Sequence, residues 1–246
     1  MKFLSQFRFR LPESLKDTRS FAENDRYDAL STRIPDFIFS PDNPLIWQNH
    51  LRYPYFRAWF GDVHGRKIAD LGCGWGFLAS RFALDGAGVV GLDISREAMK
   101  LGRMRRTVSN GGLHYLQCRL ESLPLQTGFD FVTCTDVLEH VEDLPEVIQE
   151  AARLLKPKGR FGFVTVNKTR LARMIYIDLA ENFVGFLPKG THRFEKFVPP
   201  AQLSRLFSAC GLRILDLQGI LVNPFLKRYH FWRSKAIEYI GVAEKD

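Results

Sequence analysis

The chain has 246 residues, of which 46% are hydrophobic and 25% charged, enough to bury the core of one α/β domain. Its apolar runs, such as 129–134, are far shorter than the roughly 18 residues that span a bilayer, so neither a transmembrane helix nor a hydrophobic leader is expected. The net charge of +8 favours anionic partners, either a nucleic acid or an anionic membrane. Four cysteines without C-x-x-C spacing fit a reducing, cytoplasmic compartment.

The first 65 residues are predicted to form an N-terminal arm and cap helices. Residues 1–20 mix basic and aromatic side chains, which suits a membrane headgroup layer, a solubilising tail or, less well because of Glu13 and Asp17, a mitochondrial transit peptide. Residues 21–65 are predicted to be irregular and helical, because prolines at positions 35, 41, 44 and 54 interrupt them.

From residue 67 onward, short apolar runs alternate with helix-length stretches. Strands are expected at 67–71, 88–92, 113–118, 129–134 and 160–166. Helices are expected at about 76–86, 95–109 and 143–155, the last capped by Asp143 with Pro145 in its first turn. This βαβ alternation predicts a doubly wound, parallel sheet in an α/β fold.

The last third of the chain interrupts this alternation. Leu171–Pro188 resembles an inserted lid, and a helix at about 200–210 and strands at 212–218 and near 236–243 follow it. We therefore expect a sheet of seven strands within residues 66–246, with a lid inserted at about 168–198.

A glycine-rich loop follows the first expected strand. Asp70 precedes Gly72, Gly74 and Gly76, where the backbone can turn sharply and approach a ligand closely. Position 77 is Phe, so the loop lacks the G-x-G-x-x-G spacing of dinucleotide sites and instead resembles the first motif of class I methyltransferases. That resemblance implies S-adenosylmethionine as cofactor, with Asp70 near its amino group and the following helix N-terminus near its carboxylate.

Two further positions agree with this cofactor. Asp93 ends the second expected strand, where a carboxylate can accept both hydroxyls of an adenosyl ribose. Leu120 lies in the segment after the third expected strand, which flanks the adenine ring in this superfamily. We expect Asp70, Gly72, Gly74, Asp93 and Leu120 to bind the cofactor.

The segment 131–141, FVTCTDVLEHV, resembles the ubiquinone-biosynthesis O-methyltransferases. Segments 44–52 and 188–199 and the G-x-x-x-N-P at 219–224 are also similar to that family, and the resemblance covers about residues 27 to 244. It implies a Rossmann-like class I fold whose last strand is antiparallel, and it adds Arg52 and Thr135 to the cofactor site. The sequence departs from the family at 31–36, Ile46 and His50, all in the substrate-facing cap.

The end of the fourth expected strand carries three polar residues at i, i+3 and i+4. If this segment is helical, Asp136, Glu139 and His140 project from one face at the ligand-binding edge of the sheet. The family resemblance implies that they bind Mg²⁺ or a similar ion, although the first acid there is usually Glu. The alternatives are a catalytic pair, with His140 as general base and Glu139 beside it, and purely structural roles.

The predicted activity is methylation of a hydroxyl on a polyprenylated catechol or phenol in ubiquinone biosynthesis. The expected partners are a lipid-tailed aromatic substrate and an anionic membrane surface. The apolar lid with its basic rim is expected to lie on that surface, as a peripheral element at the inner face of the membrane. Another small phenolic or lipid acceptor, a nucleic-acid methyltransferase and an inactive cofactor-binding scaffold remain as alternatives. No nucleic-acid partner is expected, because no base-gripping or basic-aromatic module is recognisable.

Overall fold

The computed structural model describes residues 23–104, 112–183 and 188–246. The basic-aromatic segment 1–20, the end of the helix expected at 95–109 and residues 184–187 of the expected lid lie outside the described residues.

A single sheet of eight strands organises the structure, in the order β3-β2-β1-β4-β5-β8-β6-β7. Strands β3, β2, β1, β4 and β5 are parallel, and β8 pairs antiparallel with both β5 and β6. The bounds are β1 Lys67–Leu71, β2 Gly88–Asp93, β3 Leu113–Gln117, β4 Phe129–Thr135, β5 Leu155–Val166, β6 Leu212–Asn223, β7 Arg228–Trp232 and β8 Glu238–Lys245. The predicted α/β fold with an antiparallel last strand is confirmed.

The expected count of seven strands is wrong, because β6 continues to Asn223 and turns back into β7. The Asn223 side chain closes this turn by accepting the backbone N–H groups of Phe225 (3.0 Å) and Leu226 (3.1 Å). Lys227 completes the turn with a φ of 48°. Arg228–Phe231 alternate polar and aromatic residues, a strand signal that the sequence analysis did not use.

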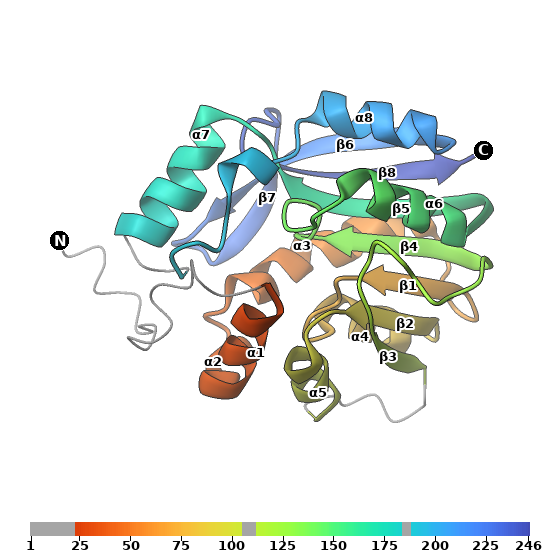
Figure 1. Ribbon diagram of the computed structural model, residues 1–246, viewed down its shortest axis with the longest axis horizontal. Helices are drawn as coiled ribbons and strands as arrows, with labels where there is room; N and C mark the ends of the chain where they lie inside the picture. Colours follow the sequence, from red (N-terminus) through yellow and green to blue (C-terminus); the bar gives the residue numbers. More distant parts are fainter. Residues whose placement is uncertain (1–22, 105–111, 184–187) are drawn as a thin grey trace.

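Helices cover both faces of the sheet (Figure 1). Their bounds are α1 Glu23–Arg33, α2 Pro35–Ile38, α3 Pro44–Phe60, α4 Phe77–Leu84, α5 Arg96–Met104, α6 Leu144–Leu154, α7 Arg170–Arg173, the π-helix η3 Met174–Phe183, the 3₁₀ helix η4 Phe194–Lys196 and α8 Pro200–Ala209. Buried residues of α3 and α4 share one core with the strands, while α6 and α8 share another. Helices α1, α2 and α7 lie beyond the edge where the parallel strands end (Figure 1).

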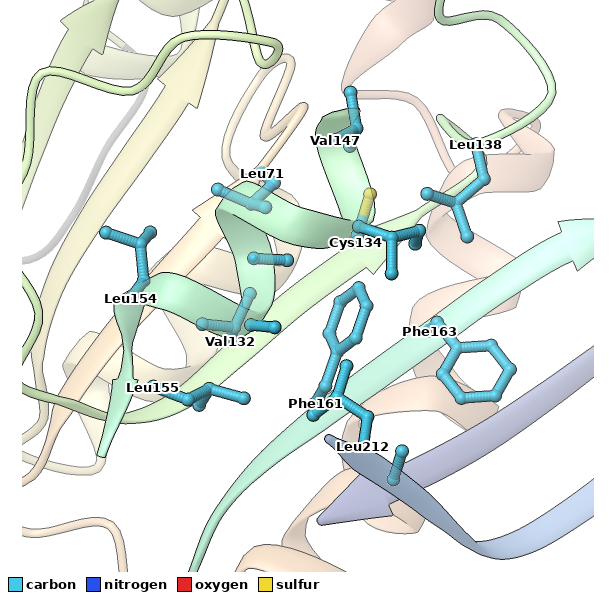
Figure 2. Close-up of a cluster of buried hydrophobic side chains, with 14 of the residues drawn as sticks. Leu71, Val132, Cys134, Leu138, Val147, Leu154, Leu155, Phe161, Phe163 and Leu212 are labelled. Atoms are coloured by element: carbon cyan, nitrogen blue, oxygen red, sulfur yellow. The ribbon is translucent and has the colours of Figure 1, made fainter. Parts of the chain in front are cut away.

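Aromatic and aliphatic side chains fill the core between the sheet and helices α6 and α8 (Figure 2). Phe161 and Phe163 of β5 are fully buried and both contact the ring of Phe207 in α8, with ring centroids 5.4 and 5.0 Å apart. Because this core fixes β4 and β5 rigidly, the loop that follows β4 has a defined position.

The cap and first-turn residues predicted for helix α6 are confirmed. Asp143 caps this helix by accepting the backbone N–H of Glu146 (3.0 Å), and Pro145 lies in its first turn. Strand β5 begins at Leu155, earlier than expected, directly after the last helical residue. The expected lid region is largely helical, since α7 continues into η3.

Candidate active site

All seven residues predicted to bind the cofactor line one cavity of about 380 Å³ at the carboxyl edge of the sheet. They are Arg52, Asp70, Gly72, Gly74, Asp93, Leu120 and Thr135. We call this space the glycine-loop cavity. Elements far apart in the sequence, from α3 to the end of β4, contribute to its wall.

The glycine loop approaches its neighbours too closely for a side chain. Gly72 has a φ of 68°, and a Cβ atom there would overlap the side chain of Val137. Its backbone N–H donates to the carbonyl of Leu92 (2.8 Å), which fixes the loop against the end of β2. A side chain at position 72 would therefore displace Val137, which also lines the cavity.

Two buried carboxylates lie at this edge of the sheet. Asp93 accepts the backbone N–H of Gly74 through Oδ2 (2.7 Å) and that of Ser95 through Oδ1 (2.8 Å). Asp70 accepts the hydroxyl of Thr133 (2.6 Å). Burial raises the pKa of Asp70 to about 7, against the hydrogen bond from Thr133 and with a further upward contribution from Asp93.

Arg52 of α3 lies between the glycine-loop cavity and the end of β4. Its buried guanidinium forms an ion pair with the partly buried Asp136 and lies 3.9 Å from a carboxylate oxygen of Glu238. Burial opposes its charge, but the two carboxylates raise its pKa. Among the described residues, Arg52 Nε and the buried Oδ1 of Asn49 have no hydrogen-bond partner, and both residues line this cavity. A ligand with a carboxylate and an amino group fits these two atoms.

A second cavity, of about 340 Å³, lies between α1, α2, the start of α3, η3 and the β6–β7 hairpin. We call it the apolar cavity, because most of its lining is aliphatic or aromatic. The two cavities share five lining residues, Tyr27, Leu45, Trp75, Asp136 and His140. A cofactor in one and an acceptor in the other would therefore meet beside Asp136 and His140.

The segment carrying Asp136, Glu139 and His140 is a turn, so the conditional prediction of a helix with three residues on one face is wrong. Asp136 has a φ of 56°, a left-handed conformation that interrupts helical hydrogen bonding. The backbone N–H of His140 donates to Val137 at 2.8 Å, which closes the turn. All three residues still line the apolar cavity.

The three side chains have different surroundings. Asp136 pairs with Arg52, while Glu139 accepts the hydroxyl of Thr165 (2.7 Å). Burial and the neighbouring Asp136 raise the pKa of Glu139 to about 8. Burial, with His192 and nearby cations, lowers the pKa of His140 well below its ordinary value, so its ring is neutral.

Several residues of this site escaped the sequence analysis. Gln48 and Asn49 lie in the same helix as Arg52, and their positions within four residues of it were the available signal. Glu238 begins β8 and accepts Gln48 Nε2 (3.3 Å) and the Tyr176 hydroxyl (2.7 Å). Its pKa is raised to about 8, first by burial and then by Asp136. A lone glutamate at the start of a strand gives no sequence signal for such a role.

Comparisons with known proteins agree with this geometry. Residues 69–163 match the methyltransferase domain family. The ubiquinone biosynthesis O-methyltransferase of Haemophilus ducreyi is 34% identical over 205 residues, covering 81% of this chain and 87% of the relative. The protein of that name from Xanthomonas oryzae pv. oryzae is 34% identical over 226 residues, covering 91% and 94%.

Solved structures share the fold at lower identity. Magnesium protoporphyrin IX methyltransferase from Synechocystis, with bound SAH, has a TM-score of 0.61 at 20% identity and covers 82% of this chain and 84% of its own. A possible histamine N-methyltransferase from Thermotoga maritima has a TM-score of 0.62 at 18% identity, with 89% and 98% covered.

The sheet order, the glycine loop and the cavity beside it define a class I methyltransferase that uses S-adenosylmethionine. Within that class, the chain belongs to the family of ubiquinone biosynthesis O-methyltransferases. It is an enzyme that methylates a small-molecule acceptor.

Replacing Gly72 with Ala should weaken S-adenosylhomocysteine binding at least tenfold, because the new methyl group displaces Val137 and the loop moves. Gly65→Ala is the matched control: its φ is also 68°, but a Cβ there meets nothing within 4 Å. Both variants should lose about 1 kcal/mol or more to backbone strain, while only Gly72→Ala loses affinity by calorimetric titration. Equal affinity of the two variants would contradict this interpretation of the loop.

Proposed function

We propose that the protein transfers the methyl group of S-adenosylmethionine to a hydroxyl of a polyprenylated catechol or phenol in ubiquinone biosynthesis. The observation that carries the proposal is the meeting of the glycine-loop cavity and the apolar cavity at Asp136 and His140. The names of the relatives support the pathway.

In this proposal, the polar ends of the cofactor bind the polar atoms of the glycine-loop cavity. Arg52 binds the carboxylate of the methionine part, and Asp70 binds its amino group. Asp93 accepts the ribose hydroxyls, since each of its oxygens keeps a lone pair beyond its backbone hydrogen bond. Gly72, Gly74, Leu120 and Thr135 complete the wall, with Leu120, which is buried, beside the adenine.

The acceptor is proposed to occupy the apolar cavity. Its lining suits an aromatic ring and the start of a hydrocarbon tail. One buried polar atom in this wall, Gln48 Oε1, has no partner among the described residues, and the Nε2 of the same amide is bound to Glu238. The remaining oxygen is a hydrogen-bond acceptor, so a ligand that brings hydroxyl donors fits it.

The proposed reaction joins the acceptor's hydroxyl oxygen to the methyl carbon while the sulfur–carbon bond breaks. The products are a methyl ether, S-adenosylhomocysteine and the proton of the hydroxyl. His140 and Glu139 are proposed as the catalytic residues, because they line the apolar cavity next to the place where it meets the cofactor. A neutral His140 is in the form that accepts a proton.

Metal binding by Asp136, Glu139 and His140 stays a prediction. In the described ranges, no three His, Cys, Asp or Glu side chains are grouped as metal ligands. Arg52 pairs with Asp136, and Thr165 donates to Glu139, so a metal ion would have to displace or share both contacts. No step above therefore uses one.

The purified protein with methyl-labelled S-adenosylmethionine and a short-chain polyprenyl catechol should yield a labelled methyl ether. Because no metal takes part in the proposed steps, the yield should be unchanged after a chelator is added. Loss of turnover after chelation that Mg²⁺ restores would instead support the predicted metal site. If no ether forms although cofactor binding is measured, the altered cap at 31–36 has changed the acceptor.

The role proposed for Asp70 predicts a pH dependence of cofactor-product binding. With a pKa of about 7, the Asp70 carboxyl keeps its proton below that pH in the ligand-free protein, but it must be ionised to bind an ammonium group. Affinity for S-adenosylhomocysteine should therefore rise as pH increases from 6 to 8, with proton release in calorimetry. Asp70→Asn should bind more weakly and lack this dependence; an unchanged pH profile in the variant would remove the assignment.

We further propose that α1 and α2 act as the cap within residues 1–65, and that residues 168–198 act as a lid. Asp28 of α1 accepts the hydroxyl of Ser95 (2.5 Å), and Trp75 donates to Ser31 (2.9 Å), so α1 is bound to the glycine-loop side. The lid contributes Ile175, Tyr176 and Leu179 to the apolar cavity. Helix α3, in contrast, is part of the sheet's core.

The lid is also proposed to rest on an anionic membrane at the cytoplasmic face. Phe183 and Leu179 are 76% and 47% exposed, and Phe225 and Leu226 at the hairpin tip are 67% and 64% exposed. Leu179 and Pro224 line the apolar cavity from these two elements, so the exposed apolar side chains lie beside the proposed acceptor site. No helix in the described part of the chain combines the length and apolarity that crossing a membrane requires.

The protein should sediment with anionic phospholipid vesicles at low salt, and less so at high salt, because basic side chains rim the lid. The double substitution Leu179→Ser and Phe183→Ser should release it. Leu84→Ser, on α4 and 58% exposed, is the control and should leave sedimentation unchanged. If wild-type protein stays in solution at low salt, the membrane proposal is wrong.

A further inference from the structure

A buried glutamate in the lid holds the residues that follow it. Glu181 of η3 is 2% exposed. Its Oε2 accepts the backbone N–H of Gly190, and its Oε1 accepts both the backbone N–H and the ring Nδ1 of His192, all at 2.8 Å. One carboxylate therefore holds the backbone at residues 190 and 192 and, through Oε1, the ring of His192.

This pairing determines what the other ring nitrogen can do. An ionised carboxylate only accepts hydrogen bonds, so Nδ1 of His192 is the donor and, in the neutral ring, Nε2 carries a lone pair. Within the described residues, Nε2 makes no hydrogen bond. The His192 side chain is 9% exposed, so most of the ring is buried.

The ring lies on the acceptor side of the site. His192 lines the apolar cavity and is absent from the wall of the glycine-loop cavity. Its centroid is 5.4 Å from that of His140, which lines both cavities, and 5.0 Å from that of Tyr176. His192 therefore lies next to His140, one of the residues at which the two cavities meet.

We propose that His192 is the residue that orients the acceptor: its Nε2 accepts a hydrogen bond from an acceptor hydroxyl, and Glu181 is the positioning residue that holds the ring. This inference rests on the proposed function. A hydroxyl that enters a mostly apolar cavity without a hydrogen-bond partner loses its hydrogen bonds to water, which weakens binding. An acceptor atom such as Nε2 replaces those bonds and therefore favours ligands whose ring carries a hydroxyl. The bond also directs the hydroxyl oxygen toward the methyl donor.

The competing interpretation is that Glu181 and His192 merely fasten the lid to residues 190–192. The variant His192→Asn distinguishes these two interpretations. The side-chain amide of Asn reaches about as far as Nδ1 and keeps a donor for Glu181, but it has no counterpart of Nε2. A fastening role predicts wild-type behaviour for this variant.

His192→Asn should lower kcat/KM for the short-chain polyprenyl catechol at least tenfold, with the melting temperature and the Kd for S-adenosylhomocysteine unchanged. Wild-type protein loaded with S-adenosylhomocysteine should also bind this catechol about tenfold more tightly than the analogue with hydrogen in place of the hydroxyls, and the variant should lose that preference. A purely structural residue would not change ligand preference in this way.

A measurement on the unmodified protein covers the case in which the variant does not fold. In ¹⁵N-histidine-labelled protein with S-adenosylhomocysteine, adding the catechol should shift the Nε2 signal of His192 while Nδ1 keeps its proton. The inference is wrong, while the proposed function stands, if the Nε2 signal does not move when the catechol binds. It is also wrong if His192→Asn keeps full turnover and the preference for hydroxylated ligands. If wild-type protein neither binds nor methylates the catechol, the proposed function fails and the inference fails with it.

Discussion

The ion pair between the buried Arg52 and the partly buried Asp136 is the interaction on which the rest of the site depends. It joins α3, which is part of the sheet's core, to the residue that follows β4 in a left-handed conformation. Removing the carboxylate of Asp136 would leave the guanidinium of Arg52 buried without its ion-pair partner, which is destabilising. The pair also lies in the wall between the glycine-loop side and the apolar side, so it determines where the two cavities meet.

The same pair sets the electrostatics of its surroundings. Glu139 and Glu238 both lie near Asp136, and burial together with this negative neighbour raises the pKa of each to about 8. Arg52 pairs with Asp136 and lies 3.9 Å from Glu238, while Thr165 and Tyr176 donate hydrogen bonds to the two glutamates. Because Tyr176 belongs to the proposed lid, this segment and the arginine of the glycine-loop cavity both lie against the carboxyl group of Glu238. This common partner links the two halves of the site physically.

Sequence patterns predicted the parts of the molecule that local physics determines. The glycine loop, Asp93 at the end of β2 and the capped helix α6 each depend on residues close together in the chain. The ion pair of Asp136 with Arg52 and the role of Glu238 depend instead on contacts between distant segments. Strand β7 was missed although it pairs with the adjacent strand β6. The sequence analysis placed Asp136, Glu139 and His140 on one face on the condition that their segment is helical, but the structure has a turn there, with Asp136 in a left-handed conformation. Metal binding, the catalytic pair and the individual cofactor contacts stay predictions, since they concern ligands rather than the fold.

The central claim is that cofactor and acceptor meet beside Asp136 and His140. A crystal structure of the protein with S-adenosylhomocysteine and the methylated product tests it most directly. The account predicts the cofactor's sulfur in the glycine-loop cavity, the product's ring in the apolar cavity, and the methyl ether oxygen facing that sulfur beside these two residues. A product ring bound outside the apolar cavity, or a sulfur facing away from it, would contradict the account.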